Sequence, residues 1–166
     1  MGADAKTETA LNGLKVLDLS RILAGPSATQ ILGDLGADVV KIEHPDGGDD
    51  TRGWGPPFMQ SPEGDRIEAS YFACCNRNKR SVALDFNNNE DRDTLLKLAS
   101  QADILVENFK PGSLAKFGLN FESLQKINIS LIYCSVTGFG QTGPYSHKPG
   151  YDFLIQGMGG FMSITG

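Results

Sequence analysis

The sequence predicts an α/β fold, a doubly wound and mostly parallel sheet of the Rossmann-like kind. Two observations carry this prediction. Short apolar runs of strand length alternate with segments of helical periodicity between residues 14 and 136. Polar or glycine-rich turns follow several of these runs, as they do at the carboxyl edge of parallel sheets. We expect one folded domain over residues 13–166, preceded by a flexible N-terminus of residues 1–12.

The first β-α-β unit is predicted over residues 14–43. Residues 14–19 form a short apolar run typical of a buried strand. Pro26 favours a helix start just after the turn at 21–24, and Gly36 favours its end. Residues 38–43 are expected to return as the second strand. The crossover between the two strands should be right-handed.

Residues 44–70 form a long polar segment rich in glycine and proline, which indicates a lid, a binding loop or an interaction arm. The only tryptophan, Trp54, either packs onto the core or covers a ligand. Asp46, Asp49 and Asp50 lack the spacing of a calcium loop and are interpreted as solvated loop residues.

The later elements continue the alternation. A short helix at 68–75, with Tyr71 and Phe72 facing inward, precedes a strand at 81–85 and a helix at 87–101. A strand at 103–107 follows, then two short helices and a buried strand. These last three elements are expected at 113–117, 121–127 and 130–136.

The glycine-rich segment from residue 135 to residue 166 is predicted to form one wall of a ligand site, although a surface loop without a ligand is the alternative. Residues 138–143 satisfy G-x-G-x-x-G. A dinucleotide site, however, needs a helix directly after the glycines. Pro144 and Pro149 exclude a helix before about Tyr151, which disfavours dinucleotide binding.

Composition narrows the function classes. The net charge of −5 disfavours a general nucleic-acid binder. The sequence contains no run of eighteen apolar residues, so no membrane span is predicted. The two histidines lack metal-ligand spacing. Cys74 and Cys75 are expected in the core, which favours a reducing compartment and a cytoplasmic location, with mitochondrial import as the alternative.

Three segments should meet at the carboxyl edge of the sheet: 21–26, 108–116 and the stretch after 136. The first opens a helix with free backbone N–H groups. The second carries Lys110 and Lys116, which could bind phosphates, and Phe109, which could stack on a flat ring. Together they favour a nucleotide-like ligand, although either lysine could be a solvated surface charge.

Six ordered runs carry a resemblance to the family III CoA-transferases, the formyl-CoA transferase or carnitine CoA-transferase family. The similarity extends from about residue 11 to residue 166, and residues 48–58 are similar to the succinyl-CoA–glutarate CoA-transferase branch. The runs are residues 18–26, 35–43, 48–54, 76–81, 107–112 and 138–144.

The resemblance implies the N-terminal part of an interlaced-dimer fold, with coenzyme A as a substrate and no permanently bound cofactor. It places Trp54 over the active site and Tyr151 and Asp152 beside the reacting thioester. Together with the residue types at the sheet edge, it assigns CoA binding to Arg21, Leu23, Ala24, His44, Leu84, Asn87, Asn108, Phe109, Lys110, Lys116 and Lys148, and it places the whole run 84–87 near CoA.

The implied activity moves CoA from an acyl-CoA to a free mono- or dicarboxylic acid through an aspartyl intermediate. The family's nucleophilic aspartate is expected beyond Gly166, so the 166-residue chain alone should be inactive. Leu23 stands where oxalate-handling members carry glutamine, which disfavours oxalate or formate as acceptor. A homodimer is expected for the full-length protein.

Two alternatives remain. One is a non-catalytic CoA-binding or dimerisation module. The other, a 2-methylacyl-CoA racemase, is disfavoured because Tyr151 occupies the position of the racemase histidine, and a tyrosine with a pKa near 10 is a poor base.

Overall fold

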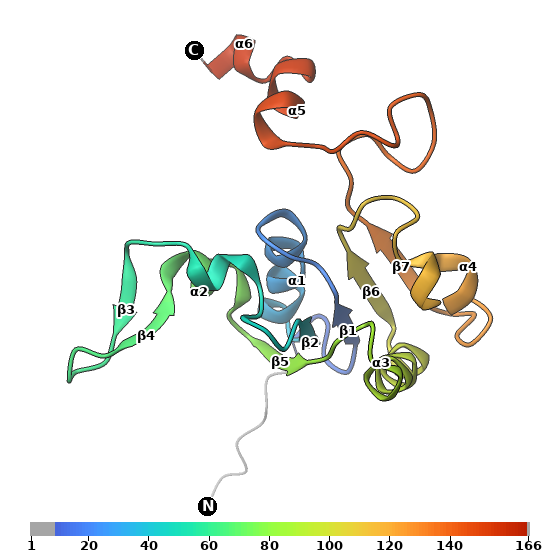
Figure 1. Ribbon diagram of the computed structural model, residues 1–166, viewed down its shortest axis with the longest axis horizontal. Helices are drawn as coiled ribbons and strands as arrows, with labels where there is room; N and C mark the ends of the chain where they lie inside the picture. The colour runs from blue at the N-terminus through green and yellow to red at the C-terminus, as the bar shows by residue number, and fades with distance from the viewer. Residues whose placement is uncertain (1–8, 166) are drawn as a thin grey trace, which may run out of the picture.

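The computed structural model describes residues 9–165, and the expectation for residues 1–8 lies outside this range. A parallel sheet of five strands in the order β5-β2-β1-β6-β7 organises the chain (Figure 1). Its strands are β1 (Lys15–Asp18), β2 (Asp38–Glu43), β5 (Lys79–Ala83), β6 (Ile104–Glu107) and β7 (Ile132–Ser135). The helical segments are α1 (Ala24–Asp34), η1 (Asp50–Gly53), α2 (Ser70–Asn76), α3 (Asn89–Gln101), η2 (Ala115–Phe117), α4 (Phe121–Leu124), α5 (Asp152–Met158) and α6 (Met162–Thr165).

Strand β1 lies at the centre of the sheet. Leu17 pairs with Val40 of β2 on one side and with Leu105 of β6 on the other. The chain builds outward from β1 to β2 and β5, then returns past β1 to β6 and β7. The order of strands therefore reverses between β1 and β6, which is the topological switch point of a doubly wound fold. The predicted fold class is confirmed.

Successive side chains of β1 point to opposite sides of the sheet, so both faces present apolar residues for helices to cover. Val16 and Val39 pack with Leu32 of α1 on one face. Leu17 packs with Leu95 of α3 in the larger core on the other face. The α1 and α3 helices are thus held on opposite sides of the sheet.

Two element predictions were incomplete. The segment 44–70 contains η1 and an antiparallel hairpin of β3 (Phe58–Gln60) and β4 (Arg66–Ala69), not an irregular loop. The tight turn of the hairpin closes through the Ser61 N–H, which donates to the Asp65 carbonyl at 2.8 Å. The helix predicted at 68–75 therefore begins only at Ser70, and Tyr71 faces outward with 46% of its surface exposed.

The edge strands also differ from expectation. The β5 strand begins two residues early, at Lys79, because Lys79 and Arg80 pair with Val39 and Val40. The β7 strand is not buried: Ile132 is 62% exposed, because β7 lies at the edge of the sheet. Of the cysteines expected in the core, Cys75 is buried and Cys74 is exposed.

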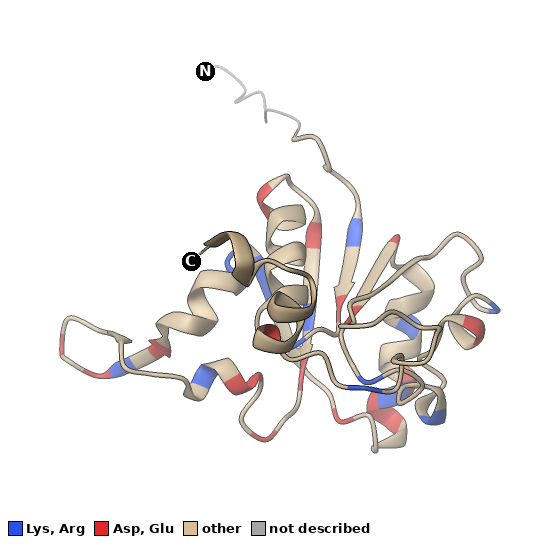
Figure 2. Cartoon of the chain, turned by 90° about the horizontal axis from the view of Figure 1, so that it is seen from above, with Lys and Arg blue, Asp and Glu red and all other residues tan. Residues whose placement is uncertain are grey.

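The C-terminal segment, residues 137–165, stands apart above the carboxyl edge of the sheet (Figure 1). None of its residues is buried, and the first helix after β7 begins at Asp152, as Pro144 and Pro149 predicted. Helices α5 and α6 carry a single charged residue, Asp152, and appear almost without charge in Figure 2. Within residues 9–165, no helix has the length and hydrophobicity needed to cross a bilayer.

Candidate functional site

A cavity of about 400 Å³ lies at the carboxyl ends of β1, β2 and β5. Its apolar floor is formed by Leu19, Ile42 and Leu84, which follow or end these three strands. The cavity is lined by Leu19, Arg21, Lys41, Ile42, Glu43, His44, Asp46, Gly48, Asp49, Asp50, Leu84, Asp85, Phe86, Asn87, Phe109 and Phe117.

Three phenylalanines form one wall of this cavity. The Phe86 ring centroid lies 6.0 Å from that of Phe109 and 5.7 Å from that of Phe117. Both contacts are tilted or edge-on, as aromatic rings prefer. A flat heterocycle could pack against this wall. The sequence analysis placed Phe109, and Phe86 within the run 84–87, near CoA, and it missed Phe117.

His44 and Asp85 are polar residues that also line the cavity. The Asp46 N–H donates to His44 Nδ1 at 3.1 Å, so the neutral ring carries its proton on Nε2. That Nε2 lies 4.0 Å from Asp85 Oδ1. A hydrogen bond from the Asn87 backbone N–H is the main cause of a lowered pKa at Asp85. Asp85 therefore remains an acceptor at neutral pH.

Arg21 lies directly after β1, at the switch point. Its backbone N–H donates to Asn108 Oδ1 at 2.8 Å, and its carbonyl accepts from Asn108 Nδ2 at 2.8 Å. A single side chain after β6 therefore satisfies both backbone groups of Arg21. The Arg21 guanidinium forms an exposed ion pair with Asp50 at 2.6 Å.

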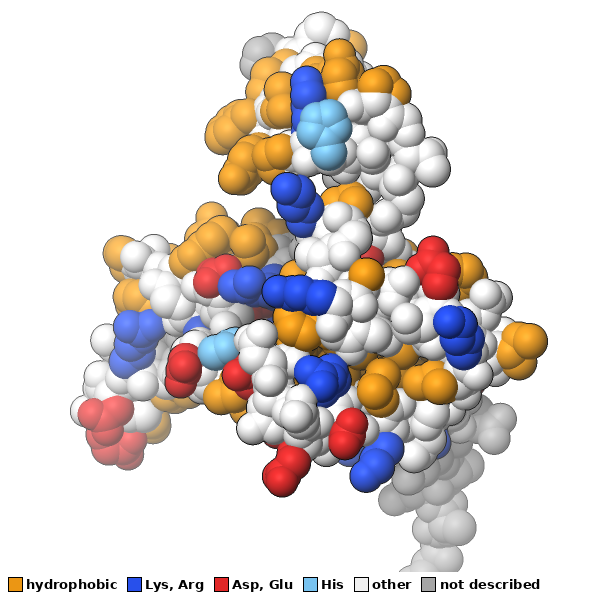
Figure 3. All heavy atoms as spheres, turned by 45° about the vertical axis from the view of Figure 1, so that its right-hand side comes forward, with side chains coloured by type: hydrophobic (Ala, Val, Ile, Leu, Met, Phe, Trp, Pro, Cys, Tyr) orange, Lys and Arg blue, Asp and Glu red, His pale blue; other side chains and the backbone are white. Residues whose placement is uncertain are grey.

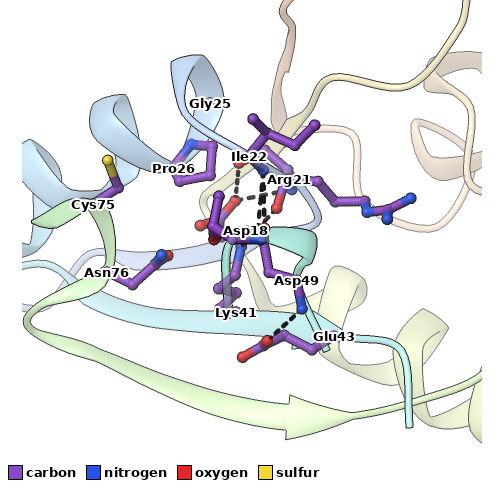
Figure 4. A network of polar contacts seen from close by, with 12 residues as sticks. Asp18, Arg21, Ile22, Gly25, Pro26, Lys41, Glu43, Asp49, Cys75 and Asn76 are labelled. Carbon is purple, nitrogen blue, oxygen red and sulfur yellow. Dashed lines mark hydrogen bonds and ion pairs between the residues drawn. The ribbon is translucent and has the colours of Figure 1, made fainter. Parts of the chain in front are cut away.

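The next residue, Ile22, has an unusual backbone, with φ at +68°. A β-branched residue in the left-handed region costs on the order of 1–3 kcal/mol and needs support from its surroundings. The Ile22 N–H donates to both carboxylate oxygens of Asp49, at 3.1 and 3.2 Å (Figure 4). Asp49 is thus a structural partner of this loop.

Asp49 is itself held in a buried ion pair, which corrects its interpretation as a solvated loop residue. Its Oδ2 lies 3.0 Å from Lys41 Nζ, and the two side chains are 0% and 1% exposed. Burial alone would raise the pKa of Asp49. The Thr51 N–H and the Lys41 charge outweigh it, so the pKa is lowered. Lys41 also donates to the Ser20 carbonyl at 2.7 Å.

A second buried pair lies beneath the start of α1. Asp18 accepts from Lys79 Nζ at 3.0 Å and from Thr29 Oγ1 at 2.6 Å. Lys79 also donates to the Pro26 carbonyl at 2.8 Å, which ties α1 to β5. A side chain at Gly25 would lie 2.3 Å from Ser20 Cβ, so only glycine fits where the helix approaches this loop.

Arg52 fixes the segment that follows β2. Its guanidinium donates to both oxygens of Glu43 at 2.7 Å, pairs with Glu68 and lies 3.6 Å from the centre of the Phe72 ring. Burial would raise the pKa of Glu43. The hydrogen bonds from Arg52, Ser81 and the Asp49 N–H instead lower it to about 2. Glu43 is therefore fully ionised near neutral pH.

The sequence-predicted binding residues are divided between three places. Arg21, His44, Leu84, Asn87 and Phe109 line the cavity. Asn108 forms hydrogen bonds with the backbone of Arg21, which lines the cavity. Leu23 directly precedes α1, and Ala24 is its first residue.

The three predicted lysines lie in different places, and none of them lines the cavity. Lys116 Nζ sits 4.5 Å from the centre of the Phe117 ring, which is part of the cavity wall. Lys110 instead lines a neighbouring cavity of about 610 Å³ beside β6 and β7. Lys148 lies on the C-terminal segment, 4.1 Å from the Tyr145 ring centre.

The supporting residues expected near the thioester are spread out. Trp54 packs edge-on against Tyr71, with ring centroids 5.6 Å apart. Tyr151 and Asp152 start α5 on the C-terminal segment, where Tyr151 is 72% exposed. Neither Trp54 nor Tyr151 lines either cavity. Figure 3 shows Lys and Arg side chains on the face between this segment and the body of the sheet.

Several site residues escaped the sequence analysis. Asp85 and Phe86 lie within the run 84–87 that the resemblance placed near CoA, whereas Phe117, the last residue of η2, was not among the residues assigned to the site. The Lys41–Asp49 pair gave no signal in the sequence, because a lysine inside a strand normally points to solvent. Among residues 9–165, no group of three or more His, Cys, Asp or Glu side chains is arranged to hold a metal ion.

Known proteins resemble this chain over nearly its whole length. It is 54% identical to the succinate–glutarate CoA-transferase of Agrobacterium fabrum over 94% of the chain, and 47% identical to the acetyl-CoA:oxalate CoA-transferase of Acetobacter aceti over 98% of it. The crystal structure of a CAIB/BAIF family protein from Brucella suis superposes with a TM-score of 0.90 at 58% identity, over 96% of the chain.

These matches cover only part of the relatives. The chain spans 39% and 40% of the length of the two transferases and 41% of the Brucella protein. The family model for CoA-transferase family III matches residues 11–166. The chain therefore belongs to CoA-transferase family III.

Proposed function

We propose that this chain supplies the CoA-binding portion of an enzyme that moves CoA from an acyl-CoA to a free carboxylic acid. One observation carries the proposal: the cavity at the carboxyl edge combines an aromatic wall, an apolar floor and a basic residue at the switch point. This combination suits the adenine ring and phosphates of CoA. The named transferases among its relatives support the reaction class.

The acceptor is proposed to be a dicarboxylic acid. A succinate–glutarate transferase is 54% identical to this chain, and an oxalate transferase is 47% identical. Substrate choice therefore varies among proteins at similar identity. We retain Leu23, at the start of α1, as a residue that disfavours oxalate.

The chemical step is proposed to use an aspartate outside residues 1–166. Its carboxylate would attack the thioester carbonyl carbon, break the C–S bond and release CoA as the thiolate, leaving an acyl group on the aspartate. The thiolate would then attack the aspartyl carbonyl of this mixed anhydride, forming an aspartyl-CoA thioester and releasing the first acid. The acceptor carboxylate would attack that thioester and displace the thiolate, which would attack the acceptor's acyl carbonyl, form the new acyl-CoA and free the aspartate. Tyr151 and Asp152 are proposed to lie beside the thioester in the complete site.

A homodimer is proposed as the working assembly. Helices α5 and α6 expose a row of large apolar side chains, with Phe153 78% and Ile164 80% exposed. Isolated surface hydrophobics are ordinary, but such a group indicates a contact surface. A second chain that covers these helices would bring Tyr151 into an enclosed environment.

Calorimetric titration with CoA tests the proposal. Lys116→Ala and Arg21→Gln are expected to weaken CoA affinity without changing the unfolding temperature. Lys97→Ala, on the exposed side of α3, and Arg77→Gln, in an exposed pair with Asp34, are the matched controls. An unchanged CoA affinity in both Lys116→Ala and Arg21→Gln would contradict this placement of the ligand.

Two activity measurements separate the alternatives. The 166-residue chain with succinyl-CoA and glutarate should give no transfer, whereas turnover abolished by Asp152→Ala would overturn the assignment of the nucleophile outside this chain. CoA binding without transfer by the full-length protein would favour a non-catalytic module. Solvent deuterium entering C2 of a 2-methylacyl-CoA would favour the racemase.

A further inference from the structure

We propose that the buried Lys41–Asp49 pair positions residues 20–22 so that Arg21 faces the CoA cavity. This inference rests on the proposed CoA site and assigns a role to two residues that need not touch the ligand. Lys41 comes from β2, and Asp49 from the turn before η1. Both reach the loop that follows β1.

The contacts of this pair bracket Arg21. On one side, Lys41 Nζ donates to the Ser20 carbonyl at 2.7 Å. On the other, Asp49 accepts the Ile22 N–H with both oxygens, at 3.1 and 3.2 Å. The 3.0 Å ion pair joins these two contacts into one unit (Figure 4). The backbone before and after Arg21 is therefore held by the same pair of charges.

The backbone of Ile22 needs this support. Rotation about its N–Cα bond from +68° to an ordinary negative value would turn the peptide plane that contains the Arg21 carbonyl. That carbonyl would then leave Asn108 Nδ2, which it now meets at 2.8 Å. The Arg21 side chain would move with its backbone, away from the cavity.

Stability alone gives no reason for charges at this position. Buried ion pairs lose much of their mutual attraction to desolvation, and apolar replacements of similar volume are often as stable or more so. An apolar pair, however, could not accept a hydrogen bond from the Ile22 N–H and could not donate one to the Ser20 carbonyl. The charged pair therefore differs from such a replacement in holding the loop at residues 20–22, not in adding stability.

The double variant Lys41→Met with Asp49→Leu tests the inference, because it keeps apolar volume and removes all three contacts to the loop. We expect cooperative unfolding to persist, CoA affinity to fall about tenfold and hydrogen exchange at the Ile22 amide to accelerate at least tenfold. Arg80→Gln with Asp38→Asn removes an ion pair at the amino end of β2 and should change neither value.

A rescue separates positioning from general damage. Glycine adopts a φ of +68° without strain, so adding Ile22→Gly to the double variant should raise its CoA affinity at least threefold. In the otherwise unchanged protein, Ile22→Gly should alter affinity less than twofold. A rescue that fails, with the fold intact, counts against the inference.

Failure of this inference can be told apart from failure of the CoA site. If the unchanged protein does not bind CoA, the proposed function is wrong, and amide exchange at Ile22 still shows whether the pair holds the loop. If the unchanged protein binds CoA and the double variant binds equally well with unchanged exchange, the inference is overturned. Should the double variant not fold, hydrogen exchange at the Ile22 amide of the unchanged protein as fast as that of an exposed amide would refute the inference.

Discussion

The loop at residues 20–22 and the C-terminal segment at residues 137–165 lie near the same edge of the sheet but are stabilised in opposite ways. In the loop, the contacts come from side chains on β2, from the turn after it and from the segment after β6. In the C-terminal segment, the described hydrogen bonds are internal or reach only Ser135. The first region is held by contacts within this chain, whereas the second leaves large apolar side chains exposed.

The largest expected effect comes from breaking the buried pair on one side only. Lys41→Met leaves the Asp49 carboxylate buried without its cation, so we expect a loss of about 3–5 kcal/mol in the free energy of unfolding. Lys148→Met, on the C-terminal segment, should cost less than about 0.5 kcal/mol. Urea denaturation measures both, and equal losses would remove the contrast between the two regions.

A core truncation should separate the regions almost as strongly. Leu95 of α3 is fully buried, and Leu95→Ala is expected to cost about 2–5 kcal/mol because it leaves a cavity. Phe153→Ala, on α5, should change the free energy of unfolding by about 0.5 kcal/mol or less when the chain is monomeric. A large loss at Phe153 at low protein concentration would show that the C-terminal segment packs within its own chain.

Acid should weaken the sheet body through Glu43. Its pKa of about 2 lies below the ordinary value of 4.5, so its contribution, about 3 kcal/mol, is complete above pH 4.5 and is lost as the pH falls toward 2. Glu43→Gln should therefore destabilise the protein at pH 7 and make little difference near pH 2. Thermal melts between pH 2 and pH 7 measure this, with the exposed Asp152→Asn as the matched variant.

The smallest effect concerns the two helix starts. Asn88 Oδ1 accepts the N–H groups of Glu90 and Asp91 at 2.8 and 3.2 Å, whereas Tyr151 gives α5 no side-chain cap. Asn88→Ala is expected to cost about 1 kcal/mol. Tyr151→Ala should cost nothing measurable in a monomer by the same denaturation assay, and a comparable loss would sharpen the case for internal packing of α5.

The sequence predicted the sheet well where strands are buried. The strand predicted at 38–43 matches β2 residue for residue, because Val39, Val40 and Ile42 are β-branched residues that favour a strand. The run at 130–136 has the same character, yet Ile132 of β7 is exposed. The apolar composition of a strand does not reveal from the sequence alone whether its side chains are covered by the same chain.

The candidate site was predictable only in part. The ends of strands pointed to Arg21 and Phe109, because loops at a carboxyl edge converge on one place. The Lys41–Asp49 pair was not predictable, since it depends on a buried lysine inside β2 and on the exact path of the turn after it. The hairpin of β3 and β4 was hidden by the glycine and proline content around it.

The carboxamide of Asn108 extends the contact between the two halves of the doubly wound sheet beyond the paired strands β1 and β6. It donates to and accepts from the same residue, Arg21, just past the carboxyl ends of these strands. An aspartate there would keep the acceptor and lose the donor, and a glutamine would be one methylene too long. Recombining the two halves from different proteins would therefore preserve this contact only where an asparagine is retained at position 108.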